Sequence, residues 1–127
     1  MFYNFANKKF IMYVLVTHIE GTTKDTVDQY GNYKSWIDYW TKHSIIVPPE
    51  ICPCCNNFIT NSNPLVGAHV KNNTDNRIYI IPCCQKCNVK YRKTRVLSPK
   101  DLQSRTFSLS EDLLVPCPSN YSNHNIL

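Results

Sequence analysis

The sequence predicts a small α+β domain in which an N-terminal strand and helix precede a short, cysteine-rich core. Its 127 residues suffice for one ordinary domain. Runs rich in β-branched and aromatic residues accompany one clear amphipathic helix, which is typical of a mixed fold. We divide the chain into residues 1–47, which hold the strand and helix, residues 48–97, which form the core, and residues 98–127, which form an extension with a polar tail.

The first predicted element is a strand over Phe10–Ile19 that is buried on both faces. Residues 1–9 are a lead-in, and residues 21–32 are a polar loop with two glycines. Lys8 and Lys9 before this apolar run resemble the start of a secretory signal, but no small-residue cleavage site follows. The chain also has no apolar run near the length of a membrane helix, so we expect no membrane partner.

The second predicted element is a helix over Tyr33–His43, with Asn32 as its N-cap. Its apolar side chains recur at positions i, i+3, i+4 and i+7, which places them on one stripe: Tyr33, Trp36, Ile37 and Trp40. A stripe with this spacing indicates core packing more than a platform for stacking bases. Asp38 and Lys42 are spaced for an ion pair on the opposite side.

The predicted core consists of two strands and a helix. Pro48 and Pro49 end the preceding helix, and a polar loop leads to a strand over Leu65–Val70. A polar connection over residues 71–77 leads to a second strand, Ile78–Ile81, which Pro82 ends. A basic helix follows over residues 87–96. Beyond it, apolar residues between 107 and 115 predict one more short element that packs back on the core.

Six of the seven cysteines fall in two clusters, which favours a metal site. Two CxxC pairs are separated by 28 residues, and each pair lets two thiolates reach one ion from a tight turn. The predicted structural zinc ligands are Cys52, Cys55, Cys84 and Cys87. Cys54 or Cys83 could substitute in a shifted register, and disulfides are the alternative use of these residues. The zinc interpretation implies a reducing, intracellular location in the cytoplasm or nucleus.

The order of motifs carries a family resemblance. A CxxC pair is followed by a strand with Gly67-Ala68-His69, a connection with Asn76, an apolar strand, and Cys84-x-x-Cys87-Asn88. This order resembles the HNH endonuclease family, over roughly Cys52–Lys93. The resemblance implies a zinc-stapled ββα-metal (treble-clef) core. It also implies a metal-dependent endonuclease that hydrolyses phosphodiester bonds in DNA.

The resemblance assigns a role to three residues. His69 occupies the position of the general base, for which a neutral imidazole is suited because its pKa lies near neutrality. Asn88 occupies the position of a ligand for a catalytic cation, Mg²⁺ or Mn²⁺, beside the leaving oxygen. Asn76 occupies the position that orients the base.

Ala68 departs from the family pattern, because many members carry a second metal ligand there. Asn88 is then the one matched ligand, and a neutral amide alone holds Mg²⁺ weakly. The alternative function is therefore a zinc-binding module that binds nucleic acid, or a protein, and has lost the nuclease site. In that case His69 is a structural histidine, and Asn88 satisfies backbone groups at the helix start.

Positive charge is concentrated in one part of the chain. Residues 69–100 carry eight basic side chains and one acidic side chain, whereas the whole chain has a net charge of +5. Such a block is typical of contact with nucleic acid phosphates, and DNA is the expected partner. The predicted contact residues lie on or beside the basic helix: Lys86, Lys90, Arg92, Lys93 and Arg95.

Overall fold

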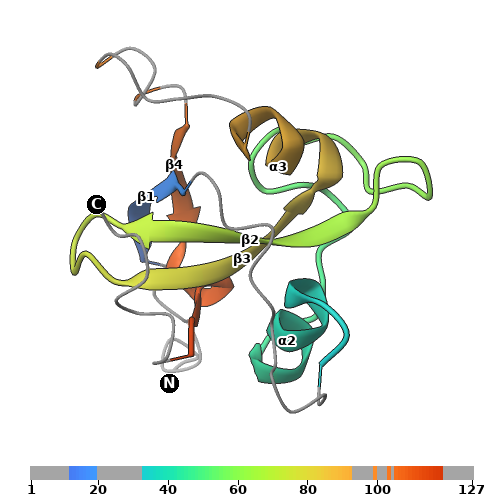
Figure 1. Ribbon diagram of the computed structural model, residues 1–127, viewed down its shortest axis with the longest axis horizontal. Helices are drawn as coiled ribbons and strands as arrows, with labels where there is room; N and C mark the ends of the chain where they lie inside the picture. The colour runs from blue at the N-terminus through green and yellow to red at the C-terminus, as the bar shows by residue number, and fades with distance from the viewer. Residues whose placement is uncertain (1–11, 20–32, 93–98, 100–102, 104, 119–127) are drawn as a thin grey trace, which may run out of the picture.

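The computed structural model describes residues 12–19, 33–92, 99, 103 and 105–118, and these form an α+β fold (Figure 1). Five antiparallel strands make one sheet in the order β4-β1-β2-β3-β5. The strands and helices are β1 (Tyr13–His18), α2 (Trp36–His43), β2 (Leu65–Asn72), β3 (Ile78–Cys84), α3 (Gln85–Arg92), β4 (Thr106–Ser110), the 3₁₀ helix η1 (Glu111–Leu113) and β5 (Val115–Pro116). None of the helices in these residues is long and apolar enough to cross a membrane.

Strand β1 lies between β2 and β4, so the N-terminal segment belongs to the same sheet as the core. Its second half pairs with β2, with Val16 opposite Asn72 and His18 opposite Val70. The prediction of burial on both faces is wrong for the first half, where Tyr13 is 63% exposed and Leu15 is 53% exposed. This half pairs with β4 alone, so β2 does not shelter it.

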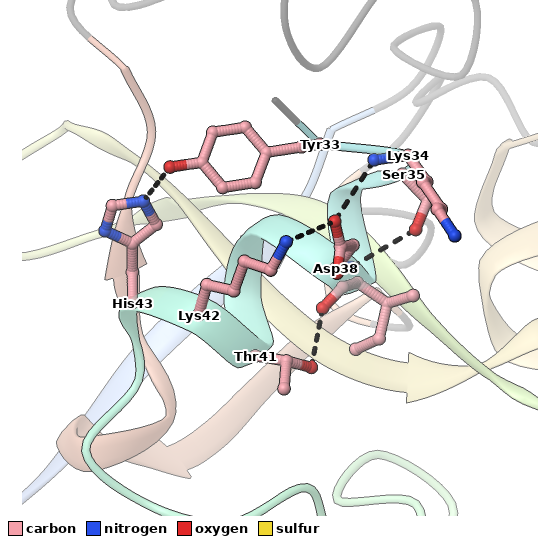
Figure 2. A network of polar contacts seen from close by, with 8 residues as sticks. Tyr33, Lys34, Ser35, Asp38, Thr41, Lys42 and His43 are labelled. Carbon is pink, nitrogen blue, oxygen red and sulfur yellow. Dashed lines mark hydrogen bonds and ion pairs between the residues drawn. The ribbon is translucent and has the colours of Figure 1, made fainter. Parts of the chain in front are cut away.

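Helix α2 begins later than its apolar stripe predicts. Its N-cap is Ser35, whose hydroxyl accepts a hydrogen bond from the Asp38 amide, while the Asp38 carboxylate accepts one from the Lys34 amide (Figure 2). The predicted cap, Asn32, lies outside the described residues. The first bond satisfies one of the amides that a helix leaves without partners at its start, and the second ties the residue before the cap to the first turn.

The two faces of α2 separate as the sequence predicts. Trp40 is fully buried and its indole N–H donates to the Leu113 carbonyl at 2.7 Å, while Trp36 is 8% exposed. On the solvent side, Lys42 lies 3.4 Å from the Asp38 carboxylate, which confirms the predicted ion pair. The Tyr33 hydroxyl and His43 Nε2 are hydrogen bonded at 2.8 Å across the same surface (Figure 2).

The β2–β3 hairpin is longer than predicted at both ends. Strand β3 continues through Pro82, which pairs with Gly67, to Cys84, so the prediction that Pro82 ends it is wrong. Strand β5 pairs with β3 at Tyr79 and Ile80 alone. Proline has no amide hydrogen to donate to a neighbouring strand. Among the described residues, no strand pairs with Pro82 on the side of β3 where β5 lies, so no hydrogen bond is lost.

The sheet separates two apolar clusters. One contains Ala68, Val70 and four cysteines, of which Cys87 comes from α3. The other contains Trp36 and Trp40 of α2 with Ile78 and Ile80. Because neighbouring residues of a strand point to opposite faces, the hairpin contributes to both. Figure 1 shows α3 and α2 on opposite sides of the hairpin.

The C-terminal segment packs back on the sheet, and it does so with two strands where one short element is expected. Strand β4 pairs with the free edge of β1, and β5 extends the sheet beyond β3. Leu109 and Val115 are buried. The five strands therefore come from all three segments into which we divide the chain.

Candidate metal centre and its surroundings

Four cysteines from two distant segments converge at the end of the β2–β3 hairpin. The sulfurs of Cys52, Cys55, Cys84 and Cys87 all lie within 4.8 Å of one another. The Sγ atoms of Cys52 and Cys87 are 4.0 Å apart, and those of Cys55 and Cys84 are 3.7 Å apart. None of the four is in a disulfide. This cluster could hold a metal ion such as zinc.

The sulfur spacing fits a tetrahedral ion. Zinc–sulfur bonds of about 2.3 Å in a tetrahedron place the sulfurs about 3.8 Å apart. The two measured distances of 3.7 and 4.0 Å bracket this value. Since the donor set consists of four sulfurs, such an ion would be held in a closed, structural site with no open position for substrate.

Backbone amides support the sulfur of Cys52. The amides of Cys54 and Cys84 lie 3.4 and 3.3 Å from the Cys52 Sγ. The loop between the first two ligands is closed by a 2.8 Å hydrogen bond from the Asn56 amide to the Cys52 carbonyl, with Asn56 in the left-handed region at φ 65°. Amides directed at sulfur stabilise a thiolate, which is the form that binds metal.

Three thiols of the cluster have raised pKa values. A hydrogen bond with Cys54 and burial raise the pKa of Cys52 to about 12. Burial also raises the pKa of Cys55 and of Cys87 above the usual thiol range. A cation that binds here must displace these protons, so its binding is coupled to pH.

The two spare cysteines, which sequence spacing leaves as alternative ligands, lie beside the cluster. Cys83 is fully buried in the apolar cluster around Val70. Cys54 is partly buried and its Sγ lies 3.9 Å from the His18 Nε2. Neither belongs to the group of four sulfurs that could share one ion.

Helix α3 starts directly at the cysteine cluster. Strand β3 ends at Cys84 and α3 begins at Gln85, two residues earlier than predicted, and it contains Cys87. The Gln85 amide donates to the Pro64 carbonyl at 2.9 Å, and the Lys86 amide donates to the Asn63 side chain at 3.0 Å. The loop before β2 therefore caps the helix, a role that the sequence interpretation missed. The Asn63-Pro64 dipeptide was the available signal, because it favours a turn.

His69 lies on the face of β2 that α2 covers. Its side chain is 5% exposed, and its Nε2 atom is shielded from solvent. The Trp36 ring meets it edge to face, with ring centroids 4.6 Å apart and an interplanar angle of 81°. Neighbouring Ala68 points to the opposite face, into the cluster with Cys87. The imidazole thus packs against the Trp36 ring, on the face of the sheet opposite the cysteine cluster.

The three residues with predicted catalytic roles come from three different places. Asn76 is exposed in the β2–β3 turn, where it has a φ of 61° and its amide donates to the Asn72 carbonyl at 2.7 Å. His69 is paired with Ile80, three residues from that end of the hairpin, which is about 10 Å. Asn88 is partly buried on α3, across the sheet from α2. The structure does not bring the three together around one ion.

The predicted nucleic-acid contacts are described in part. Lys86 and Lys90 are exposed on α3, one turn apart. Arg92 is the last residue of α3, and Lys93 and Arg95 lie outside the described residues. Asp75, the one acidic residue between 69 and 100, lies in the turn at the other end of the hairpin and accepts a hydrogen bond from the Tyr79 hydroxyl.

Comparison with known proteins adds no assignment. No protein-family model, curated protein or solved structure matches this chain.

Proposed function

We propose that this protein is a zinc-stabilised, treble-clef-like domain that binds nucleic acid, with DNA as the expected ligand, through helix α3. The order of elements supports the fold assignment. A loop with one cysteine pair precedes the β2–β3 hairpin, and the second pair lies where the hairpin meets α3. One ion would then tie the loop, the hairpin and the helix together, as in the ββα-metal core that the sequence resembles.

The observation that carries the proposal concerns helix α3. The cysteine cluster anchors this helix, and two lysines of the helix are exposed close to the cluster. Cys87 is 7% exposed and points into the cluster, whereas Lys86 and Lys90 are exposed on the same helix. A rigidly held helix presents its charges in a fixed arrangement, which favours contact with regularly spaced phosphates.

The local balance of charge supports the same ligand. Residues 69–100 have a net charge of +7, while the rest of the chain is slightly acidic. Helix α3 itself contains no acidic side chain. A surface of one sign attracts a polyanion and accelerates its association at low ionic strength.

The proposal is tested by salt-dependent binding to a labelled DNA duplex and to its single strand, measured by fluorescence anisotropy between 50 and 200 mM salt. We expect K86Q/K90Q to weaken binding at low salt and to reduce the slope of log K against log salt by about two for duplex DNA. The matched control is K34Q/K42Q, which removes the same charge near α2 and should bind like the wild type.

Two results would overturn this function. One is an absence of binding to either DNA at 50 mM salt by protein that contains its metal. The other is equal loss of affinity in the two double variants, because that would mean that total charge matters and the position of α3 does not.

A metal-dependent HNH-like endonuclease is the second candidate. The observation that favours it is the hairpin-then-helix order, with His69 on the first strand and Asn88 on the helix. The burial of His69 against Trp36 is the observation that ranks it second, since a general base must reach the water that it activates.

The nuclease is tested by nicking of supercoiled plasmid with Mg²⁺ or Mn²⁺. An active site at this position predicts nicking by the wild type that falls at least a hundredfold in H69A and N88A, while H43A, a change at an exposed histidine, nicks like the wild type. Equal nicking by the wild type and H69A, or nicking by none of the proteins, would reject this candidate.

A further inference from the structure

The loop that carries the first cysteine pair also exposes an apolar pair that the metal site does not use. Phe58 is 70% exposed and Ile51 is 44% exposed. The two residues face each other in an antiparallel bridge, so their side chains lie next to each other on one side of the loop. Phe58 and Ile51 together form a small exposed apolar patch, and apolar patches of this kind occur at contact surfaces.

This pair is held in a fixed position. The Cys52 amide donates to the Asn57 carbonyl at 2.8 Å, and the Ile59 amide donates to the Glu50 carbonyl at 2.9 Å. These bonds lie on both sides of the Ile51–Phe58 bridge. With Cys52 also in the metal cluster, the loop presents the phenyl ring from a rigid base, so little conformational freedom would be lost on binding.

The same loop reaches the start of α3. Two residues after Phe58, Thr60 is bridged to Asn63, and the Asn63 side chain accepts the hydrogen bond from the Lys86 amide. The segment is the green loop that passes beside α3 before β2 in Figure 1. The segment that carries Phe58 is therefore linked to the first turn of α3 through Asn63.

We propose that Phe58 stacks on an unpaired base of a single-stranded nucleic acid whose phosphates contact Lys86 and Lys90. This inference rests on the proposed nucleic-acid binding and names the form of ligand. An aromatic ring beside lysines is the arrangement that recognises single strands, since every base has a face for stacking and each phosphate has a charge. A duplex hides the faces of its bases within its own stack, so it cannot use Phe58.

The experiment compares three ligands of equal length by fluorescence anisotropy: a single-stranded oligonucleotide, the same strand with abasic sites at its central positions, and the duplex. The proteins are the metal-loaded wild type, F58A, F58W and I45A. Ile45 is 81% exposed and follows α2, so I45A removes a comparable exposed apolar side chain from another surface. Metal content is measured for each protein to show that the loop is intact.

We expect F58A to weaken binding of the intact single strand about tenfold, F58W to retain it and I45A to leave it unchanged. The abasic strand should bind the wild type about tenfold more weakly than the intact strand, and F58A should lower that affinity no further. Binding of the duplex should not change in F58A, and the salt slope should stay the same because no charge is altered.

The inference is overturned by equal affinity of the wild type and F58A for the intact single strand, whatever α3 contributes. A loss in F58A that is the same for intact, abasic and duplex ligands also overturns it, because a stacked base is then not involved. Both results leave the role of α3 standing as long as K86Q/K90Q weakens binding, so the two proposals fail separately.

Discussion

At the scale of single residues, His18 is a buried imidazole whose neutral form the fold requires. It is 4% exposed, meets Phe107 edge to face at 5.6 Å between ring centroids, and lies beside Cys54. Burial, with the Arg105 charge nearby, lowers the pKa of His18 to about 4. Its contribution to stability is therefore complete above the unfolded pKa of 6.5 and is lost as pH falls toward 4.

This predicts a measurable loss of stability in mild acid. Between pH 7.5 and pH 5, His18 should lower the free energy of unfolding by about 2 kcal/mol, because the unfolded chain takes up a proton that the folded chain refuses. Urea unfolding at several pH values tests this in the wild type, H18F and H43Q. The pH dependence should shrink in H18F and persist in H43Q. Identical pH profiles for the wild type and H18F would contradict the assignment.

Gly67 is a second residue with a specific physical role. A Cβ atom at this position would lie 2.5 Å from the Trp36 carbonyl carbon and 2.7 Å from the Ile37 amide nitrogen. Strand β2 and helix α2 thus pack so closely that a side chain of any size forces backbone to move.

We therefore expect G67A to destabilise the fold by about 1–3 kcal/mol through overpacking. Lys71 is on the same strand and, by alternation, the same face, but it is only partly buried, so K71A is the matched control and should stay within about 0.5 kcal/mol of the wild type. Urea midpoints measure both. A wild-type midpoint for G67A would show that β2 and α2 are not in such close contact.

At the scale of elements, α2 depends on the polar groups at its first turn. The Ser35 hydroxyl accepts from the Asp38 amide at 3.2 Å. We expect S35A to lower the free energy of unfolding by about 1 kcal/mol, because a helix amide loses its acceptor. T41A is the control: Thr41 is exposed in the last turn and its hydroxyl bonds the Ile37 carbonyl, which stays bonded within the helix. An equal, small effect of both changes would contradict the cap.

The sequence pattern predicts that several helices and strands exist, but it does not predict where they begin and end. The stripe of Trp36 and Trp40 predicts α2, and the apolar runs predict β2 and β3, because burial imposes their periodicity. The start of α2 depends on which of several polar residues caps it, and the local Ser35-x-x-Asp38 spacing is the capping signal that the interpretation with Asn32 missed. Pro82 stays in β3 because of its pairing with Gly67 and the short length of β5, and neither is encoded near Pro82.

At the scale of the whole molecule, a metal ion in the cysteine cluster would crosslink segments that lie far apart in the sequence. It would join the loop around Cys52 to the end of β3 and the first turn of α3, on the face of the sheet opposite α2. The two apolar clusters are small, and a domain of this size gains much from one such crosslink.

Metal binding should therefore release protons and add stability together. Because the pKa values of Cys52, Cys55 and Cys87 are raised and ligands bind zinc as thiolates, we expect at least three protons to be released per zinc ion. Calorimetric titration of the metal-free protein with zinc in buffers of different ionisation enthalpy measures this number. A release of one proton or fewer would contradict a site of four thiolates.

The spare cysteine beside the cluster offers a matched pair of variants. C52S should lose stoichiometric zinc and unfold at lower denaturant concentration, since it removes a ligand that also accepts two amide bonds. C54S removes a neighbouring thiol outside the group of four and should keep one zinc per chain. Retention of zinc by C52S together with its loss in C54S would assign the ligand to Cys54 instead.

Only the four cysteines of the candidate site could be predicted from the sequence, because their residue type and their spacing both indicate metal ligands. Two CxxC pairs specify four ligands locally, and the structure brings those four together. The positions of His69 and Asn88 depend on which face of β2 is covered by α2, which sequence order does not reveal. Phe58 and Asn63 lie in a polar loop, and the exposure of Phe58 and the contact of Asn63 with α3 arise from the folding of that loop around the cysteines.

X-ray absorption at the zinc edge, recorded on the purified protein, shows whether four cysteines hold one structural zinc ion at the base of α3. We predict one zinc per chain with four sulfur neighbours at about 2.3 Å and no nitrogen or oxygen neighbour. A first shell that includes nitrogen or oxygen, or a folded protein without stoichiometric metal, would contradict it.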